Sequence, residues 1–396
     1  MSESAQAYVV DAVRTAGGRR GGSLSAWHPA DLAGLVLDAL IERSGVAPAL
    51  IDDVILGCVS QVGPQTSNIA RTAVLSSTLP VSVPGVTIDR QCGSSLQATQ
   101  FAAQAVMSGT QDLVIAGGVE SMSTVPILSA ITAGLAAGMP SPYAGDRVSA
   151  TFPGENFDQF IGAERVGEKY GVTRDELIDF AILSHQRAIA ARDSGWFTDE
   201  IVPVPILMDD GTRTEFALDE GIRPPDRDKM TSLPALRPGG LVNAATSSQI
   251  TDGASAVLVA SQRALQEHGL APMARIVAMD AVGSDPTMVL EGPIPATERV
   301  LAKAGLTLED IDLYEVNEAF GTVPLAWAKA VGGRMDRLNV NGGAQALGHP
   351  LGATGTKLLA TLIHELRRRG GRYGLIAICE GLGTANSMII EALPPR

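Results

Sequence analysis

The stretch Leu40-Ile-Glu-Arg-Ser-Gly-Val-Ala-Pro-Ala-Leu-Ile-Asp-Asp-Val-Ile55 decides the fold, because a second stretch of the chain echoes it. That second stretch is Leu301-Ala-Lys-Ala-Gly-Leu-Thr-Leu-Glu-Asp-Ile-Asp-Leu-Tyr-Glu-Val316. Each copy is typical of a helix that stops at a glycine, followed by a short acidic turn and an Ile/Val-rich strand. The chain therefore contains two related helix–turn–strand units, far apart in sequence.

A second pair of segments repeats in the same order. A helix predicted over 93–107 and a strand over 112–116 correspond to a helix over 355–369 and a strand over 373–378. Two matches in one order indicate an internal duplication rather than chance similarity. Because each half alternates strands with helices, we predict an α/β fold of stacked layers with mostly buried sheets.

The chain of 396 residues is long enough for two or three domains. The segment 121–240 has no counterpart in the second half, is rich in Pro and Gly, and contains an amphipathic helix over 174–192. We interpret it as an inserted loop domain that carries binding residues. The domains expected on either side are 1–120 joined with 241–265, and 270–396.

Composition excludes several classes of function. The chain is 45% apolar and 18% charged, as expected for a soluble α/β protein. An aromatic content of 4% and a net charge of −13 argue against nucleic acid as a partner. The N-terminus lacks the features of a secretory signal, and the longest apolar-to-small stretch, 127–139, is too short to span a bilayer. Three cysteines without close pairing fit a reducing compartment, so we expect a cytoplasmic protein with no membrane partner.

Cys92 is the first candidate for chemistry. It lies in Val86-Thr-Ile-Asp-Arg-Gln-Cys-Gly-Ser-Ser-Leu-Gln-Ala-Thr99, a β-rich run that breaks at Gly93 and continues as a helix. Unpaired N–H groups at a helix start stabilise a thiolate, so we expect the pKa of this thiol to fall below its ordinary value of about 8.5. The alternative is a buried structural cysteine.

His349 occupies the matching junction in the second half, within Asn339-Val-Asn-Gly-Gly-Ala-Gln-Ala-Leu-Gly-His-Pro350. If the halves pack about a local two-fold axis, the two junctions meet, and a neutral imidazole there would take the proton of the Cys92 thiol. The other four of the five histidines, at positions 28, 185, 268 and 364, are expected on solvated surface.

Two further residues end strands of the second half. Cys379 follows the strand over 373–378 and precedes a Glu-Gly-Leu-Gly turn; it is either a proton carrier, a disulfide partner of the first thiol or a small core residue, and a reducing compartment disfavours the disulfide. Asn317, in Tyr314-Glu-Val-Asn-Glu-Ala-Phe320, could hold a water or donate to an oxyanion, or simply form a turn. Cys58 is interpreted as core. No zinc spacing, dinucleotide fingerprint or phosphate loop is found, so no metal is expected.

Together these segments resemble the thiolase family, the acetyl-CoA acyltransferases, over essentially the whole chain. The motifs that carry the resemblance are Val10-Asp-Ala-Val-Arg-Thr15, Cys92-Gly-Ser-Ser95, Ala116-Gly-Gly-Val-Glu-Ser-Met-Ser123, Asn317-Glu-Ala-Phe320, Asn339 to His349-Pro350, and Cys379-Glu-Gly381. The resemblance implies a duplicated thiolase fold: two pseudo-symmetric αβαβα layered domains with the inserted loop domain. The pattern looks most similar to bacterial thiolases of lipid or steroid breakdown.

The resemblance also implies roles for individual residues. Cys92 would attack the 3-keto carbon of a 3-oxoacyl-CoA, and Cys379 would protonate the departing acetyl-CoA carbanion. His349 would activate the thiol and, with a water held by Asn317, bind the thioester oxygen. The backbone N–H groups of Cys92 and Gly381 would form a second oxyanion hole. An incoming CoA thiol would then release the shortened acyl-CoA in a ping-pong scheme.

Coenzyme A would be a substrate rather than a permanently bound cofactor, held by the inserted segment and its flank. Arg223 matches the family's arginine near the nucleotide end, and Ser248 matches its serine on the pantetheine arm. Arg227, Lys229 and Arg237 would supply a local basic patch for the phosphates. The family resemblance further implies a homodimer or homotetramer.

Three departures from the family pattern leave the acyl group open: Ser95 where glycine is frequent, Gln159-Phe-Ile-Gly-Ala-Glu-Arg165 near the acyl pocket, and Glu380-Gly-Leu-Gly383 in place of a glycine triplet. A biosynthetic thiolase that condenses two acetyl-CoA molecules is the main alternative. A decarboxylating ketoacyl synthase would lack the second cysteine, a non-catalytic homologue would have lost a catalytic residue, and a Cys–His hydrolase would not need Cys379.

Overall fold

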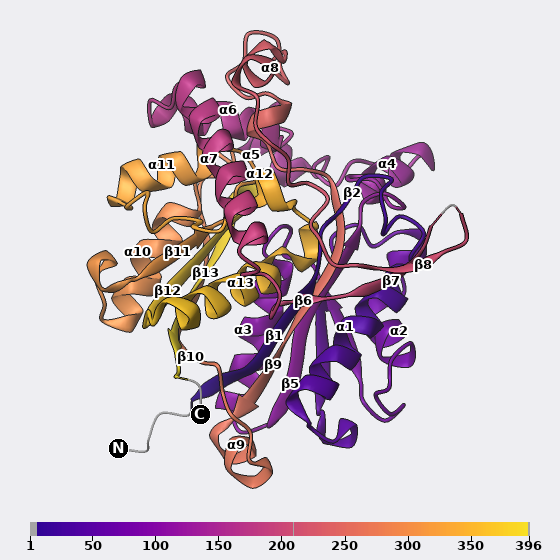
Figure 1. The fold of residues 1–396 in the computed structure, drawn as a ribbon. Coiled ribbons are helices and arrows are strands. Elements are labelled where there is room, and N and C mark those ends of the chain that lie inside the picture. Colours follow the sequence, from indigo (N-terminus) through magenta and orange to yellow (C-terminus); the bar gives the residue numbers. More distant parts are fainter. Residues whose placement is uncertain (1–5, 209, 395–396) are drawn as a thin grey trace.

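A mixed sheet of 11 strands runs through the computed structural model, which describes residues 6–208 and 210–394 (Figure 1). Its strands follow one another in the order β11-β12-β13-β10-β1-β9-β5-β3-β4, with β2 attached to β9 and β6 attached to β1. The strands are β1 (Ala7–Thr15), β2 (Gly18–Arg19), β3 (Asp53–Gly57), β4 (Gly85–Ile88), β5 (Leu113–Ser121), β6 (Ile201–Val202), β9 (Thr251–Ser261), β10 (Ala274–Gly283), β11 (Leu313–Val316), β12 (Tyr373–Glu380) and β13 (Thr384–Ala392).

The strand order confirms the duplication. Starting from the central antiparallel contact of β1 with β10, each half continues through two antiparallel pairings and then a parallel one: β1-β9-β5-β3 on one side, β10-β13-β12-β11 on the other. The two repeated segments occupy equivalent places, since both helices that precede β3 and β11 end at a left-handed glycine, Gly45 and Gly305.

Helices cover the sheet on both faces (Figure 1). Helices α3 and α13 lie against one another and contact strands of both halves, α1 and α2 cover the outer face of the first half, and α10 and α11 belong to the core of the second half. These and the remaining helices outside the insertion are α1 (Pro29–Ser44), α2 (Ile69–Leu75), α3 (Ser94–Met107), α9 (Gln262–His268), α10 (Pro293–Ala304), α11 (Thr322–Val331), α12 (Ala344–Leu347) and α13 (Thr354–Arg369).

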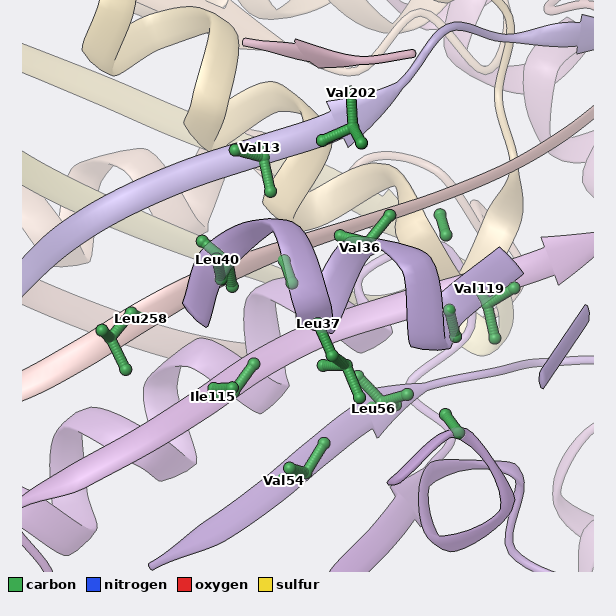
Figure 2. Close-up of a cluster of buried hydrophobic side chains, with 14 of the residues drawn as sticks. Val13, Val36, Leu37, Leu40, Val54, Leu56, Ile115, Val119, Val202 and Leu258 are labelled. Atoms are coloured by element: carbon green, nitrogen blue, oxygen red, sulfur yellow. The ribbon is translucent and has the colours of Figure 1, made fainter. Parts of the chain in front are cut away.

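The buried side chains follow the period of two that a strand buried on both faces requires. On β9, Leu258 belongs to the core beneath α1, whereas Val257 and Val259 belong to the core around α3 and α13. Figure 2 shows Leu37 and Leu40 of α1 over the sheet side chains of the first of these cores. The predicted layered α/β fold is therefore confirmed.

The inserted segment is anchored to the sheet by a buried ion network. Arg14 of β1 is fully buried and donates to Glu200 (2.6 Å) and to Asp219 (2.8 Å), two carboxylates of the insertion. Removing one charge from such a buried network strongly destabilises the fold, because its partner is left buried and unpaired. The elements of the insertion besides β6 are α4 (Ser129–Ala136), α5 (Asp146–Thr151), α6 (Gln159–Lys169), α7 (Arg174–Asp193), β7 (Val204–Leu207), β8 (Arg213–Phe216) and α8 (Arg227–Ser232).

The helix predicted over 174–192 is α7, which begins with a capping box between Thr173 and Glu176. The domain boundaries remain a prediction. The inference about a secretory signal rests in part on residues 1–5, which lie outside the described residues. In the described part of the chain, every helix is too short or too polar to cross a membrane.

Candidate active site

Cys92 lies in the short loop between β4 and α3. The preceding residue, Gln91, has a left-handed backbone with a φ of 48°, and α3 begins two residues later at Ser94. The position at a helix start is as predicted, but the expected lowering of the thiol pKa is wrong. Burial raises the pKa of Cys92 well above its ordinary value, and the nearby Cys379 and Glu380 raise it further. Lost hydration therefore outweighs the helix dipole.

Hydrogen bonds fix the tautomer of His349. The Thr354 hydroxyl donates its single proton to the Pro350 carbonyl at 2.9 Å, and the same oxygen lies 2.6 Å from His349 Nδ1. Nδ1 must therefore carry the ring proton and donate it to Thr354, which leaves the lone pair on Nε2. The Asn317 amide nitrogen lies 3.3 Å from that Nε2. The imidazole thus presents a basic nitrogen beside a carboxamide donor.

The surroundings of His349 keep it neutral. Burial lowers the pKa of its imidazole to about 3, and the charge of Lys357 acts in the same direction. Lys357 is itself buried and donates to the carbonyls of Leu347 and Gly348, each at 2.7 Å, so it also holds the backbone that leads into His349. A neutral imidazole is the form that can accept a proton from a thiol.

Cys379 and Asn317 are where the sequence placed them. Cys379 is a fully buried free thiol near the end of β12, and burial followed by the influence of Glu380 raises its pKa to about 12. It is therefore protonated at neutral pH. Asn317 directly follows β11, and its side-chain oxygen makes no hydrogen bond. Cys58, the remaining cysteine, is buried in the core as predicted.

A cavity of about 320 Å³ opens beside Cys92. Its walls are mostly apolar and come from the insertion, from the loop before α3 and from the turn after β12. The lining residues are Val59, Ser60, Asp89, Gln91, Cys92, Ile127, Leu128, Ala130, Ile131, Tyr143, Asn156, Phe157, Asp158, Gln159, Phe160, Leu351, Gly381 and Leu382. Gly381 thus lies at the same cavity as Cys92, as expected. The segment from Gln159 to Arg165, where the family pattern is not followed, contributes its first two residues to the wall.

A smaller cavity of about 120 Å³ lies on the His349 side. It is lined by His349 and Ser248 and shares four wall residues with the cavity of Cys92: Ile127, Gln159, Phe160 and Leu351. The two compartments are therefore neighbours. Cys92 from the first half and His349 from the second half therefore line adjoining cavities.

Arg223 lies farther out, in a cleft of about 340 Å³ together with His185 and Lys229. Of the expected basic patch, Arg227 forms an ion pair with Asp179, and Arg237 approaches Asp158 at 4.0 Å. The patch is thus partly neutralised by acidic neighbours.

The prediction that His185 is solvated is wrong. Its side chain is fully buried at the wall of the Arg223 cleft, neither ring nitrogen makes a hydrogen bond, and burial followed by Arg223 lowers its pKa to about 4. His28 and His268 are exposed, and His364 is half-buried against the carbonyl of Ala12. A signal for His185 was present, because Ala181 and Ala188 lie on the same face of α7 at helical spacing.

Ser95, which replaces a frequent glycine, joins the two central helices. Its hydroxyl accepts a hydrogen bond from the Thr356 backbone N–H at 3.0 Å. The end of β3 packs closely against this residue, since a Cβ on Gly57 would lie 2.6 Å from the Ser95 nitrogen. The serine is therefore a cross-link between α3 and α13. Within the described residues, no group of His, Cys, Asp or Glu is arranged to hold a metal ion.

Comparison with known proteins gives the family. The model of the thiolase N-terminal domain matches residues 7–263, and that of the thiolase C-terminal domain matches residues 270–392. A steroid 3-ketoacyl-CoA thiolase of Mycobacterium tuberculosis is 50% identical over 389 residues, which cover 98% of this chain and 94% of that protein.

A 3-oxoadipyl-CoA/3-oxo-5,6-dehydrosuberyl-CoA thiolase of Escherichia coli is 42% identical, with 98% of this chain and 99% of that protein covered. The crystal structure of the Bacillus anthracis acetyl-CoA acetyltransferase matches with a TM-score of 0.88 at 36% identity, covering 99% of this chain and 100% of that one. The chain belongs to the thiolase family of acyltransferases.

Proposed function

We propose that this thiolase cleaves a 3-oxoacyl-CoA with coenzyme A, giving acetyl-CoA and a shortened acyl-CoA through an acyl-Cys92 intermediate. One observation carries the proposal: the cavity that holds the Cys92 thiol adjoins the one that holds a neutral His349 with its lone pair on Nε2. A second buried thiol, Cys379, is protonated at neutral pH, and its charge raises the pKa of Cys92 once it ionises. We assign the roles of nucleophile, base and acid to Cys92, His349 and Cys379.

In the first half-reaction, His349 Nε2 takes the proton of Cys92, and the sulfur attacks the 3-keto carbon. The Cα–Cβ bond breaks, the electron pair passes to the acetyl-CoA fragment as an enolate, and Cys379 protonates its carbon. In the second half-reaction, the Cys379 thiolate takes the proton of the coenzyme A thiol, whose sulfur attacks the acyl-thioester, and Cys92 leaves as the sulfur receives the proton held by His349. The reverse sequence is a Claisen condensation that uses the same groups.

Negative charge develops on oxygen twice in this scheme, and each time a donor pair is proposed. His349 and a water on Asn317 serve the thioester oxygen of the enolate, and the N–H groups of Cys92 and Gly381 serve the tetrahedral oxygen at the 3-keto carbon. Because burial raises the pKa of Cys92, little thiolate is present at neutral pH. The donors act on the negative charge once it has passed from the sulfur to the substrate oxygens, which favours the transition state over the ground state.

Coenzyme A is proposed to enter along the second compartment. Ser248 lines the narrow cavity that leads to His349, which suits the pantetheine arm. Arg223 and Lys229 line the outer cleft, which suits the nucleotide phosphates. Arginine and lysine are the usual partners of phosphate groups, and the cleft lies in an otherwise acidic chain with a net charge of −13.

The acyl group is proposed to be bulky and apolar, as in the breakdown of fatty acids or of steroid side chains and rings. The cavity of about 320 Å³ beside Cys92 falls in the size range of pockets that enclose drug-sized molecules and is mostly apolar. The relative from Mycobacterium tuberculosis is named for a steroid 3-ketoacyl-CoA substrate. We further propose that the enzyme works in the cytoplasm as a homodimer or homotetramer.

The test is to incubate the protein with coenzyme A and with acetoacetyl-CoA, a long straight-chain 3-oxoacyl-CoA or a steroid-derived 3-oxoacyl-CoA, following loss of the enolate absorbance. Cys92→Ser is expected to abolish thiolysis and acyl labelling, whereas Cys58→Ala, at the core cysteine, retains both. Thiolysis that survives in Cys92→Ser would falsify the mechanism. Equal or better turnover of acetoacetyl-CoA than of the larger substrates contradicts the assignment of the acyl group.

A further inference from the structure

Glu380 is a buried carboxyl group that the mechanism does not use. It follows Cys379 at the end of β12, and its side chain is fully buried; apart from an interaction with the Thr384 side chain, neither of its oxygens has a hydrogen-bond donor. Two other buried glutamates at strand ends, in contrast, accept several hydrogen bonds each. Glu120 accepts hydrogen bonds from the backbone of Val59, Ser60 and Gly352 and from Gln65, and Glu318 accepts from Ser184, Asn339 and Gln345.

The Glu380 carboxyl lies against Gly93, the residue that follows the nucleophile Cys92. A Cβ added to Gly93 would lie 1.9 Å from Glu380 Oε1 and 2.7 Å from Asn386 Oδ1, so both oxygens rest against the same point of the Cys92–Gly93 turn. The Asn386 amide nitrogen donates to the Gly93 carbonyl at 2.9 Å, which fixes the orientation of that side chain. Its Oδ1, the oxygen that lies 2.7 Å from the same Cβ position, makes no hydrogen bond either.

Two acceptor oxygens without a donor repel one another, and leaving both buried and unpaired is costly. A proton on Glu380 removes the conflict, because a carboxylic acid donates one hydrogen bond. We propose that Glu380 is a positioning residue held as an uncharged carboxylic acid that donates to Asn386 Oδ1, and that this keeps negative charge away from the two active-site thiols. The inference rests on the proposed role of Cys92 as nucleophile.

The surroundings support the uncharged state. Burial raises the pKa of Glu380 to about 8. The titratable or charged groups that act on it or feel its charge are Asp89, Arg90, Cys92 and Cys379. The interaction with the Thr384 side chain and the charge of Arg90 oppose the rise without cancelling it, and the Arg90 Nε is itself without a hydrogen bond. Once ionised, Glu380 raises the pKa of both thiols, which lowers the fraction of Cys92 that is present as the thiolate at a given pH.

The first test measures the protonation state through thermal stability. A carboxyl that stays protonated in the folded protein but ionises in the unfolded chain makes the protein less stable as pH rises from the unfolded pKa to the folded one. Glu380→Gln retains a donor and has no proton to lose. The Tm of Glu380→Gln relative to wild type is therefore expected to rise between about pH 5.5 and 8 and then level off.

Glu215→Gln, at an exposed glutamate of β8, is the matched control and is expected to show no such trend. Parallel Tm profiles for Glu380→Gln and wild type would overturn the proposal. So would a Glu380→Gln protein that does not fold, because the amide supplies the same kind of donor to Asn386.

The second test reads the effect on the nucleophile. The alkylation rate of Cys92 by iodoacetamide is followed by peptide-resolved mass spectrometry at pH 7 and 9.5. In wild type, Glu380 is ionised at pH 9.5 and depresses the thiolate fraction of Cys92 there, whereas Glu380→Gln has no such charge. The rate at pH 9.5 divided by the rate at pH 7 is therefore expected to be at least about threefold larger in Glu380→Gln than in wild type, since half a pKa unit changes the thiolate fraction about threefold. An unchanged ratio, or the same increase in Asp89→Asn, contradicts the proposal. Alkylation does not require turnover, so failure of the proposed function is a separate result.

Discussion

Replacing Thr354 with valine should disable the base without emptying its site. The valine keeps the volume of the side chain but removes the oxygen that accepts from His349 Nδ1 at 2.6 Å and the proton that reaches the Pro350 carbonyl at 2.9 Å. An unpaired buried donor or acceptor costs about 1–3 kcal/mol. Because the Pro350 carbonyl still accepts from the Ala353 N–H, only His349 Nδ1–H loses its partner, and we expect a loss of about 1–3 kcal/mol in the free energy of unfolding.

Catalysis should suffer as well, because the ring loses the contact that holds its proton on Nδ1. If about 1.4–2.8 kcal/mol of that contact serves to orient the base, kcat falls about 10- to 100-fold. Thr354→Ser is the matched control, since it keeps the hydroxyl. Urea unfolding and steady-state thiolysis would be measured on both variants. The reasoning is refuted if Thr354→Val keeps the wild-type kcat, or if Thr354→Ser loses as much activity as Thr354→Val.

Two further changes test the packing at Gly93 and the anchoring of the insertion. Gly93→Ala places a methyl group 1.9 Å from Glu380 Oε1, so we expect at least about 3 kcal/mol of destabilisation in urea unfolding and a large loss of thiolysis. A Gly93→Ala variant as stable as wild type would show that the carboxyl does not pack against this turn. Arg14→Leu leaves Glu200 and Asp219 buried without their cation and should cost about 3–5 kcal/mol. Unchanged unfolding of Arg14→Leu would mean that the insertion is held by other contacts.

The sequence was informative where the structure depends on local pattern. The helix ends at Gly45 and Gly305 and the end of β11 before Asn317 follow from turn residues and periodicity, whereas β12 runs two residues beyond the predicted strand and includes Cys379. It was misleading where desolvation decides. The position of Cys92 at a helix start was foreseen, but not that burial would raise its pKa.

Other features could not be foreseen because they join distant segments. Arg14 meets carboxylates about two hundred residues away, and the approach of Glu380 and Asn386 to Gly93 appears only when the β12–β13 hairpin packs against the start of α3. No periodicity encodes such contacts. They depend on the register of the sheet and on the path of the insertion.

The protonation states of the site have a common cause and a common consequence. Burial keeps Cys92 and Cys379 as thiols, His349 as a neutral imidazole and Glu380 as an acid. Charge in this pocket is therefore unfavourable until something binds that can share it. A pre-formed thiolate would react with any electrophile that enters, whereas a neutral site waits for a substrate whose developing oxyanion meets the fixed donors. On this argument, Cys92 gains its reactivity mainly from the geometry of those donors, and the helix start positions the thiol without ionising it.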